Sequence, residues 1–305
     1  MSNIYDVIVI GAGTAGMTAA IYARRASKTV LLIEAKSFGG QIINTPHIDN
    51  YPAAAHMSGY DFASAIFGQV KESGAQIVYD RAVGITDGDI KKVATENGGY
   101  EGKTVIIATG SENRKLGVER EDELVGRGVS YCATCDGAFF RGKKVAVVGG
   151  GNTALEDALY MSDLAETVYL IHRRDAFRGD EATAALLKSR PNVEFVLNSR
   201  VTKLNAEKRL QSVEVTDKDG ITRTIEVSGL FVAVGRIPEN RDFAAVIELD
   251  GAGYAVSGED CRTKTPGIYV AGDNRTKELR QLVTAAADGA AAATEAVRYI
   301  NSNKF

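Results

Sequence analysis

Two cysteines, Cys132 and Cys135, lie three positions apart in the stretch YCATCDG, and the chain of 305 residues has one further cysteine, Cys261. A pair at this spacing can hold a metal ion, form a structural link or exchange electrons as a dithiol. A structural zinc site needs four ligands, and beyond the pair the sequence offers only Cys261 and three histidines, with no second close pair. We therefore expect no metal site, which leaves a reactive dithiol or two inert cysteines.

The residues that follow the pair favour the reactive dithiol. The stretch DGAFF predicts a turn that leads into a helix, and a helix N-terminus lowers the pKa of a thiol. Asp136 is ordinarily a solvated turn residue, but beside a leaving thiolate it can act as a general acid, provided that its surroundings raise its pKa. Phe139 and Phe140 fit either an apolar docking surface or the core.

An internal repeat supplies the elements that must position these residues. The stretch YDVIVIGAGTAGMTAAIYARRASKTVLLIEA begins at Tyr5 and KKVAVVGGGNTALEDALYMSDLAETVYLIHR begins at Lys143, and a shift of 138 positions superposes them without a gap. Each copy contains a β-branched apolar run, a glycine-rich turn, an Ala-rich helical stretch and a second apolar run. This order predicts a strand–helix–strand unit in each copy.

The glycine-rich turns have the pattern of a dinucleotide-binding fingerprint. The first glycine permits the tight turn, the second lets the backbone approach a pyrophosphate, and a small third residue lets helix and strand pack closely. One such motif is weak, because many strand-to-helix turns need glycine. Two copies in the correct context predict two dinucleotide sites, with the phosphates at the helix N-termini. The positions are Gly11, Gly13 and Gly16 in the first copy and Gly149, Gly151 and Ala154 in the second.

The two copies differ where the second strand ends. Glu34 lies 23 positions after the first glycine, whereas the second copy has His172 followed by Arg173, Arg174 and Arg178. A carboxylate at that place accepts hydrogen bonds from ribose hydroxyls, and a guanidinium cluster suits a 2′-phosphate. We expect an adenine dinucleotide such as FAD or NAD in the first site and NADP(H) in the second. The alternative for HRRDAFR is a solvated basic turn.

Three further apolar runs indicate how the domains are connected. VIIATG, LFVAVG and IYVAGD end at Gly110, Gly235 and Asp273, and they predict strands that lead to the dinucleotide edge of a sheet. If the first and last belong to the first copy and the middle one to the second, the second domain is an insertion. We therefore expect an α/β fold with two Rossmann-like dinucleotide-binding domains, formed by residues 1–113 with 242–305 and by residues 114–241.

Composition argues against several classes of function. The formal net charge of -3 and the lack of a dense basic run argue against a nucleic-acid surface. No apolar stretch is long enough to cross a membrane, and the sequence from Met1 shows no basic leader or signal-peptide core, so we expect a cytoplasmic protein. In a reducing compartment a close pair of cysteines is more often catalytic or metal-binding than structural.

The order of the motifs resembles the low-molecular-weight thioredoxin reductases over essentially the whole chain. The motifs are the first fingerprint, CATCD, the second fingerprint GGGNTA, HRRDAFR, AGD, and RQ at the start of an Ala-rich helix. The resemblance implies FAD in residues 1–113 with 242–305, NADPH in residues 114–241, a thioredoxin or thioredoxin-like partner, and a homodimer. The implied FAD residues are Gly11, Gly13, Gly16, Glu34, Gln41, Asn50, Gly110, Gly272, Asp273, Arg280 and Gln281, and the implied NADPH residues are Gly149, Gly151, Asn152, Thr153, His172, Arg173, Arg174 and Arg178.

The resemblance also implies the chemistry. Hydride passes from NADPH to the flavin, electrons reduce a Cys132–Cys135 disulfide, and a thiolate attacks the disulfide of the partner. It assigns Cys135 to the flavin, Cys132 to the partner and Asp136 to proton donation. Because the dithiol and NADPH share one domain and the flavin lies in the other, we expect the inserted domain to swivel.

Three other functions fit parts of the sequence. A dithiol oxidase, which passes electrons from thiols to oxygen, has little need for a second phosphate site. The same holds for a reductase supplied by ferredoxin or by a reduced flavin carrier. The GGGNTA and HRRDAFR stretches argue against both. A non-catalytic redox sensor would not need two neighbouring cysteines.

Overall fold

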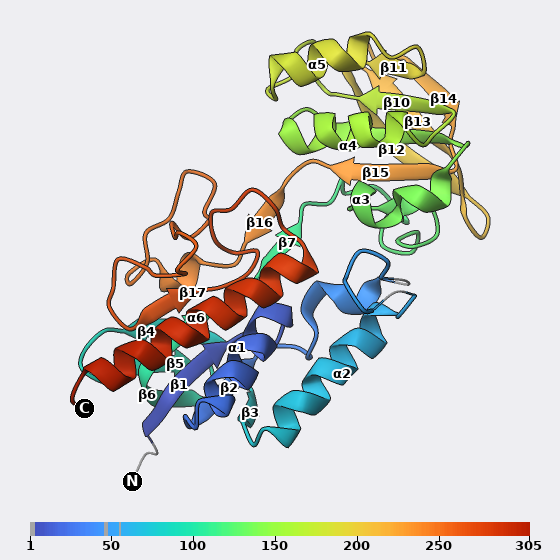
Figure 1. Ribbon diagram of the computed structural model, residues 1–305. Helices are drawn as coiled ribbons and strands as arrows, with labels where there is room; N and C mark the ends of the chain where they lie inside the picture. Colours follow the sequence, from blue (N-terminus) through green and yellow to red (C-terminus); the bar gives the residue numbers. More distant parts are fainter. Residues whose placement is uncertain (1–3, 46–47, 55) are drawn as a thin grey trace. The chain divides into compact units, whose positions relative to one another are not determined.

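The computed structural model describes residues 4–45, 48–54 and 56–305. The chain forms two compact units, Met1–Glu112 with Ile237–Phe305, and Asn113–Arg236 (Figure 1). The sequence predicts that the second unit starts at residue 114, one residue after its observed start at residue 113. It predicts that the first unit resumes at residue 242, five residues after the observed position, residue 237.

The first unit is built on one sheet with the strand order β3-β2-β1-β6-β5-β4, in which β17 also pairs with β6. The pairs that involve β1, β2, β3 and β17 are parallel, whereas β4, β5 and the start of β6 are antiparallel. The strands are β1 (Ile4–Ile10), β2 (Val30–Glu34), β3 (Gln76–Tyr79), β4 (Ala82–Thr86), β5 (Lys91–Thr95), β6 (Gly98–Ile107) and β17 (Ile268–Val270).

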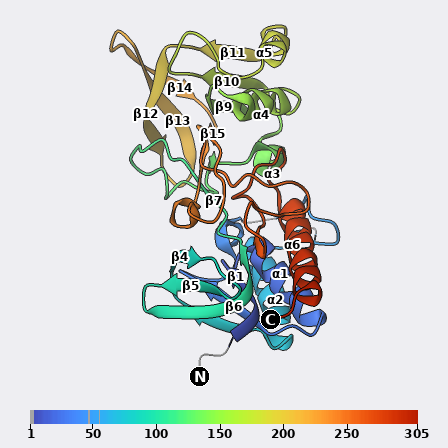
Figure 2. The same ribbon diagram turned by 90° about the vertical axis from the view of Figure 1, so that its left-hand side faces the viewer.

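Three long helices cover one face of this sheet, as Figures 1 and 2 show. They are α1 (Thr14–Arg25), α2 (Gly59–Glu72) and α6 (Leu282–Ser302), and short 3-10 turns occur at η1 (Gly40–Asn44) and η3 (Arg241–Phe243). Small residues let α1 and α6 approach closely, because a Cβ added to Gly289 would lie 2.2 Å from the Ala15 carbonyl oxygen. Burial of the Ala-rich faces of these helices against the sheet forms one core cluster.

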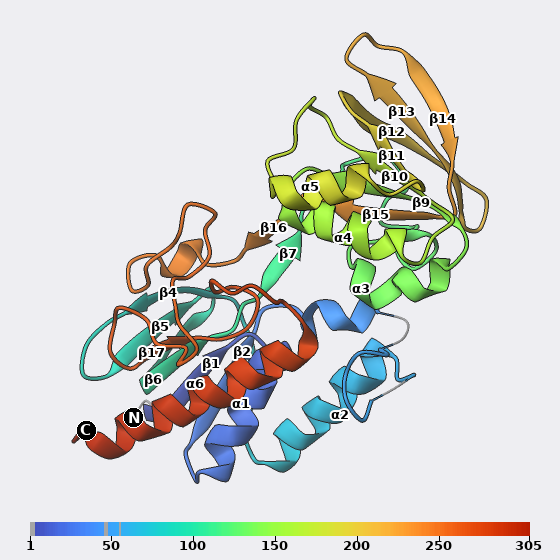
Figure 3. The ribbon, with the colours of Figure 1, turned by 45° about the horizontal axis from the view of Figure 1, so that its top comes forward.

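The second unit contains a parallel sheet with the strand order β11-β10-β9-β15-β8. Helices α4 and α5 cover one face, and an antiparallel sheet of β12, β13 and β14 covers the other (Figure 3). The elements are β8 (Val129–Ser130), α3 (Ala133–Asp136), η2 (Gly137–Phe140), β9 (Lys144–Gly149), α4 (Asn152–Ser162), β10 (Thr167–Ile171), α5 (Glu181–Lys188), β11 (Val193–Val196), β12 (Ser199–Ala206), β13 (Leu210–Asp217), β14 (Thr222–Glu226) and β15 (Gly229–Ala233).

The predicted repeat is confirmed. The orders β1-α1-β2 and β9-α4-β10 are both strand–helix–strand, and α1 and α4 begin at Thr14 and Asn152, 138 positions apart. Of the three further predicted strands, β6 and β17 join the first sheet and β15 joins the second. The chain passes between the units at β7 (Ser111–Asn113) and β16 (Arg236–Pro238), which pair with each other. In the described part of the chain, no helix combines the length and apolar character needed to span a bilayer.

Candidate active site

The cysteine pair lies at the C-terminal end of β8, on the surface of the second unit. Cys132 and Cys135 form a disulfide with their Cα atoms 5.3 Å apart. Cys132 is the N-cap residue of α3 and Cys135 lies within this one-turn helix. Both cysteines are partly exposed, and Cys132 Sγ lies 3.4 Å from the hydroxyl of Thr134. The pair is therefore a partly exposed disulfide.

Asp136 differs from an ordinary turn aspartate because it is half-buried. Burial raises the pKa of the Asp136 carboxyl, and a hydrogen bond from Ser130 opposes this shift. The Ser130 hydroxyl donates to Asp136 Oδ2 at 2.6 Å and accepts a hydrogen bond from the Cys132 N–H at 3.0 Å. A carboxyl next to the disulfide thus keeps its proton at higher pH than a solvated aspartate, as the predicted general acid requires.

A second carboxylate, Glu121, is buried near the cysteine pair and bonds the residue that precedes Cys132. Glu121 is 3% exposed and accepts hydrogen bonds from the N–H groups of Leu116 and Gly117, both at 2.9 Å. The hydroxyl of Tyr131, which directly precedes Cys132, donates to Glu121 Oε1 at 2.7 Å. Sequence reasoning missed Ser130, Tyr131 and Glu121, because nothing in the sequence shows which polar residues will be buried together.

The two phenylalanines that follow the cysteine pair have different environments. Phe140 packs against the core, with its ring 5.3 Å from that of Phe231 in an edge-to-face arrangement. A Cβ added to Gly229 would lie 2.7 Å from the Phe140 ring, so the contact is close. Phe139 is 47% exposed. Phe140 is therefore a core residue, and Phe139 is the one that presents apolar surface beside the dithiol.

The first fingerprint has the tight packing that its glycines predict. Gly11 has φ +103°, and a Cβ added there would lie 2.4 Å from the Ala108 carbonyl oxygen. A Cβ on Gly16 would lie 1.8 Å from the carbonyl oxygen of Gly11. By contrast, a Cβ on Gly13, the N-cap residue of α1, would meet no atom within 4 Å. The first and third glycines pack strand against helix, and the second leaves open space at the helix N-terminus.

Glu34 lies at the end of β2 beside this turn. Its Oε2 accepts the Ala12 N–H at 2.6 Å, and its Oε1 accepts the Lys36 N–H at 2.8 Å. The carboxylate thus links the strand end to the fingerprint, which is where an acidic residue can meet a ribose.

The remaining predicted residues of the first unit are brought together from distant parts of the sequence. Asn50 Nδ2 donates to Gln281 Oε1 at 3.0 Å, although the residues are 231 positions apart. Gln41 Nε2 donates to the carbonyl oxygen of Ser111, the residue after Gly110. Gly110 has φ +72°, and no atom lies within 4 Å of a Cβ added there. Gln281 is the N-cap residue of α6 and forms a capping box with Thr284.

Gly272 and Asp273 follow β17 in a loop that leads to Arg280. The Arg280 guanidinium donates from Nε to the Asp273 carbonyl oxygen at 3.4 Å and lies 4.1 Å from the centre of the Tyr254 ring. A Cβ added to Gly272 would lie 2.9 Å from the Ala15 side chain of α1. The loop therefore lies against the first turn of α1, where the fingerprint leaves open space.

A buried ionic cluster supports this loop from α6. Asp288 is 5% exposed and accepts hydrogen bonds from Arg275 at 2.7 and 2.8 Å, from Lys277 at 2.8 Å and from the Gly272 N–H at 2.9 Å. Cys261 lies beside it, and burial raises the pKa of this thiol to about 12, so Cys261 is an inert thiol rather than a redox group.

The second fingerprint contains a close contact that the sequence did not reveal. A Cβ added to Gly150 would lie 2.1 Å from the His172 ring, which is buried and stacks on Phe177 at 5.3 Å. Burial and the charges of nearby arginines lower the pKa of His172, which is therefore neutral at pH 7, and its Nε2 has no hydrogen-bond partner in the described structure. A Cβ on Gly151, the N-cap residue of α4, would meet no atom within 4 Å.

The arginine cluster lies on the exposed turn after β10. Arg173, Arg174 and Arg178 are all exposed, and within the described residues none of them forms an ion pair. The Arg178 N–H donates to the Gly150 carbonyl oxygen at 2.7 Å, which ties the turn to the fingerprint. Asn152 Oδ1 accepts the Asp180 N–H at 2.9 Å, and Thr153 is exposed at the start of α4. The three guanidiniums are thus available to an anion beside the open glycine.

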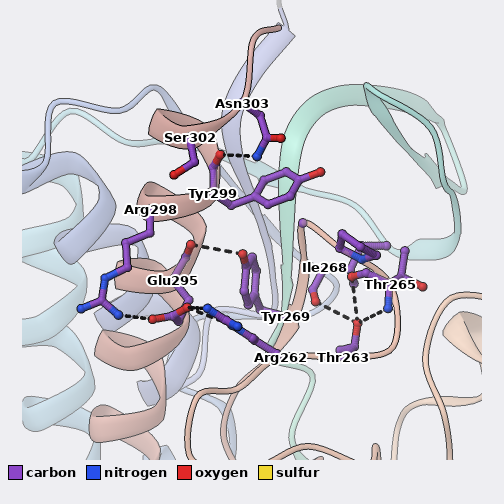
Figure 4. A pocket seen from close by; sticks show the side chains of 12 residues that line it. Arg262, Thr263, Thr265, Ile268, Tyr269, Glu295, Arg298, Tyr299, Ser302 and Asn303 are labelled. Carbon is purple, nitrogen blue, oxygen red and sulfur yellow. Dashed lines mark hydrogen bonds and ion pairs between the residues drawn. The ribbon is translucent and has the colours of Figure 1, made fainter.

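The described residues contain no group of three or more His, Cys, Asp or Glu side chains arranged to hold a metal ion. A pocket of about 370 Å³ lies between α6 and the loop before β17 (Figure 4). The guanidinium groups that line the pocket form ion pairs with Glu295. Arg262 Nη2 lies 2.6 Å from Glu295 Oε2, and Arg298 pairs with the same carboxylate. None of the predicted site residues, all of which lie in the described part of the chain, belongs to its lining.

Comparisons with known proteins agree with this arrangement. The sequence matches the family described as pyridine nucleotide-disulphide oxidoreductase over residues 5–289. A thioredoxin reductase of Listeria innocua is 41% identical over 99% of this chain and 96% of the relative, and one of Treponema pallidum is 41% identical over 99% of each. The crystal structure of thioredoxin reductase from Streptococcus pyogenes has a TM-score of 0.93 and 38% identity, covering 99% of this chain and 100% of that one.

Proposed function

Because the chain belongs to the thioredoxin reductases, within the pyridine nucleotide-disulphide oxidoreductases, we propose that Cys132 and Cys135 deliver electrons to the disulfide of a thioredoxin-like protein. The chain is an NADPH-dependent thioredoxin-disulfide reductase, and its family uses FAD and NADPH. One observation carries the residue assignment: a surface disulfide lies next to a half-buried carboxyl, on the same unit as the arginine-bearing fingerprint.

The first unit is the proposed FAD-binding domain. The open space beside Gly13 suits a pyrophosphate, because the N–H groups at the start of α1 point toward it. Glu34 would bind the ribose of the adenosine half, and Asp273 and Gln281 would approach the cofactor from the loop that lies against α1. When bound, FAD supplies a carrier that accepts hydride from NADPH and passes two electrons to a disulfide.

The second unit is the proposed NADPH-binding domain. Gly151 leaves the corresponding space at the start of α4, and Arg173, Arg174 and Arg178 would bind the 2′-phosphate. His172 is buried beneath the turn, so we assign it to shaping the turn around Gly150. This phosphate site favours an NADPH-driven reductase over a dithiol oxidase or a ferredoxin-driven enzyme.

The dithiol and Asp136 perform the exchange with the partner. A Cys132 thiolate attacks one sulfur of the partner disulfide, and the second sulfur of the partner leaves as a thiolate that takes a proton from Asp136. Cys135 then gives its proton to Asp136 and attacks Cys132 Sγ, which releases the first sulfur of the partner as a thiolate. One thiolate and one thiol of the enzyme become a disulfide, and the partner disulfide becomes one thiolate and one thiol. Phe139, exposed beside the pair, would provide apolar docking surface.

Two finer features belong to the same proposal. A homodimer is implied by the family, and sedimentation of the purified protein tests it. A cytoplasmic location is supported by the buried free thiol of Cys261 and by a cysteine pair suited to catalysis, which are typical of a reducing compartment; cell fractionation tests it.

The test is anaerobic turnover of the FAD-loaded protein with oxidised thioredoxin. We expect one NADPH oxidised for each thioredoxin disulfide reduced, with NADH a poor substitute. NADPH oxidation that leaves the thioredoxin oxidised would refute the assignment of the partner.

A further inference from the structure

Ser130 connects the catalytic carboxyl to the backbone of the redox pair. The residue ends β8, whose pairing with β15 places Ser130 opposite Phe231. Ser130 is 4% exposed. The hydroxyl lies 2.6 Å from Asp136 Oδ2, accepts the Cys132 N–H at 3.0 Å, and lies 3.3 Å from the Cys132 carbonyl oxygen.

A serine hydroxyl has one proton to donate, so these contacts cannot all be satisfied in the same way. When Asp136 is ionised, the hydroxyl donates to Oδ2, which is the shorter contact. When Asp136 carries a proton, the carboxyl can itself donate to Ser130, and the hydroxyl then turns to the Cys132 carbonyl oxygen. The acceptor to which the Ser130 hydroxyl donates therefore depends on whether Asp136 is protonated. A change of acceptor changes the hydrogen bonding of the Cys132 backbone.

On the premise of the function proposed above, we propose that Ser130 is a positioning residue that holds Asp136 against Cys132 and governs proton transfer between Asp136 and the sulfurs. The hydrogen bond stabilises the ionised carboxyl, so it opposes the effect of burial. Asp136 can then both release a proton to a departing thiolate and recover one from Cys135. Without Ser130, burial alone would act on the carboxyl and hold its proton more tightly.

Few other titratable groups face Asp136. Helix α3 packs on α4, and a Cβ added to Gly137 would lie 2.8 Å from Met161 Sδ and 2.9 Å from the Tyr160 ring. Asp157 lies one turn before Met161 on α4, and burial together with Glu156 raises the pKa of Asp157 to about 7, although Arg236 opposes the shift. Burial and Ser130 are the causes that act on Asp136 itself. The titration of Asp157 must therefore be separated from that of Asp136.

The direct test is a carboxyl ¹³C NMR titration of Asp136 in the oxidised, FAD-loaded enzyme, with the signal assigned by its loss in Asp136→Asn. In Ser130→Ala we expect the midpoint of the Asp136 titration to move to higher pH. Ser130→Thr, which keeps a hydroxyl, should restore the wild-type midpoint. Asp157→Asn removes the neighbouring titration, and Ser162→Ala removes the hydroxyl of another buried serine, which in the described structure donates to the Leu159 carbonyl oxygen.

Turnover gives a second measurement. Ser130→Ala should slow thioredoxin reduction about tenfold, the scale of one hydrogen bond to a charged group, while NADPH still reduces the flavin at the wild-type rate. Thermal unfolding and flavin content establish that the variant is folded. An unchanged or lower midpoint for Asp136 in folded Ser130→Ala would overturn the inference. Wild-type turnover in Asp136→Asn would instead overturn the proposed role of Asp136, so the two failures are distinguishable.

Discussion

Asp136 shows how one residue type can act differently in two environments. A solvated aspartate is ionised at neutral pH, but burial beside the disulfide raises the pKa of Asp136. The protonated form is the one that can neutralise a departing thiolate. The contribution of Asp136 as a general acid should therefore fall as the pH rises through the raised pKa.

We expect Asp136→Asn to slow the thioredoxin half-reaction by about 10² to 10⁴, the range for loss of a general acid, and to remove the pH dependence that Asp136 causes. NADPH and flavin should bind normally, because Asp136 is not among the proposed nucleotide-binding residues. Stopped-flow mixing of the reduced enzyme with thioredoxin over a range of pH measures both effects. A rate within twofold of the wild type would exclude Asp136 from proton transfer.

At the scale of elements, we propose that the turn after β10 gives the second unit a preference for a phosphorylated cofactor. Replacing Arg173, Arg174 or Arg178 with alanine should raise the KM for NADPH about thirtyfold, which corresponds to about 2 kcal/mol for one charge-assisted hydrogen bond. The KM for NADH should hardly change. Arg190→Ala, which removes an arginine paired with Asp163 at 2.9 Å in the same unit, is the matched control. Equal effects on both cofactors would show that the turn does not bind the 2′-phosphate.

The loop after β17 depends on the ionic cluster beneath it. Asp288→Ala leaves Arg275 and Lys277 buried without their common partner, so we expect a loss of about 3 to 5 kcal/mol in the free energy of unfolding and poorer flavin retention. Asp242→Ala, which breaks an exposed pair with Arg81, should cost at most about 1 kcal/mol. Urea unfolding of both variants compares them, and similar small losses would contradict the role given to the cluster.

The same cluster gives stability a pH dependence. Burial would raise the pKa of Asp288, but hydrogen bonds from Arg275 and Lys277 outweigh burial and hold the pKa below its usual range. A lowered carboxyl pKa stabilises the fold at any pH above the usual aspartate value of about 3.9, and this contribution is lost as the pH falls below it. Urea unfolding between pH 3 and pH 7 should show a steeper acid loss in the wild type than in Asp288→Ala.

Elements that follow a local pattern could be predicted from the sequence, and contacts between distant residues could not. The repeat predicted β1-α1-β2 and β9-α4-β10, because the apolar periods and glycines are local signals. No local sequence pattern predicted the antiparallel sheet of β12, β13 and β14. This sheet covers one face of the parallel sheet of the second unit and forms a core cluster with it. The Asn50–Gln281 bond and the burial of His172 under Gly150 likewise depend on tertiary packing.

At the scale of the whole molecule, the order of the chain separates the chemistry into two units. The dithiol and the arginine turn are in one unit and the first fingerprint is in the other, and the chain crosses between them only at β7 and β16 within the described structure. In the function proposed above, both the dithiol and NADPH must reach the same flavin in turn. We therefore propose that the second unit reorients on these crossings during turnover.

Fluorescence energy transfer can detect this reorientation. Dyes on Tyr60→Cys in α2 and Leu186→Cys in α5, both at exposed positions, report the separation of the units. Labelling the oxidised enzyme protects Cys132 and Cys135 as a disulfide, and Cys261 is buried. We expect NADP⁺ to shift the distribution of transfer efficiencies in the reduced enzyme. One distribution, unchanged by NADP⁺ and by reduction, would contradict the proposal.

The central claim is that electrons leave the enzyme through the dithiol, with Cys132 as the attacking sulfur. Mass spectrometry of a trapped complex tests it most directly, using thioredoxin that lacks its resolving cysteine and carries its attacking cysteine as an activated mixed disulfide. Cys135→Ser should form a covalent adduct through Cys132, because no second thiol remains to resolve it, and Cys132→Ser should form none. An adduct through Cys135 in Cys132→Ser, with none through Cys132 in Cys135→Ser, would contradict the account.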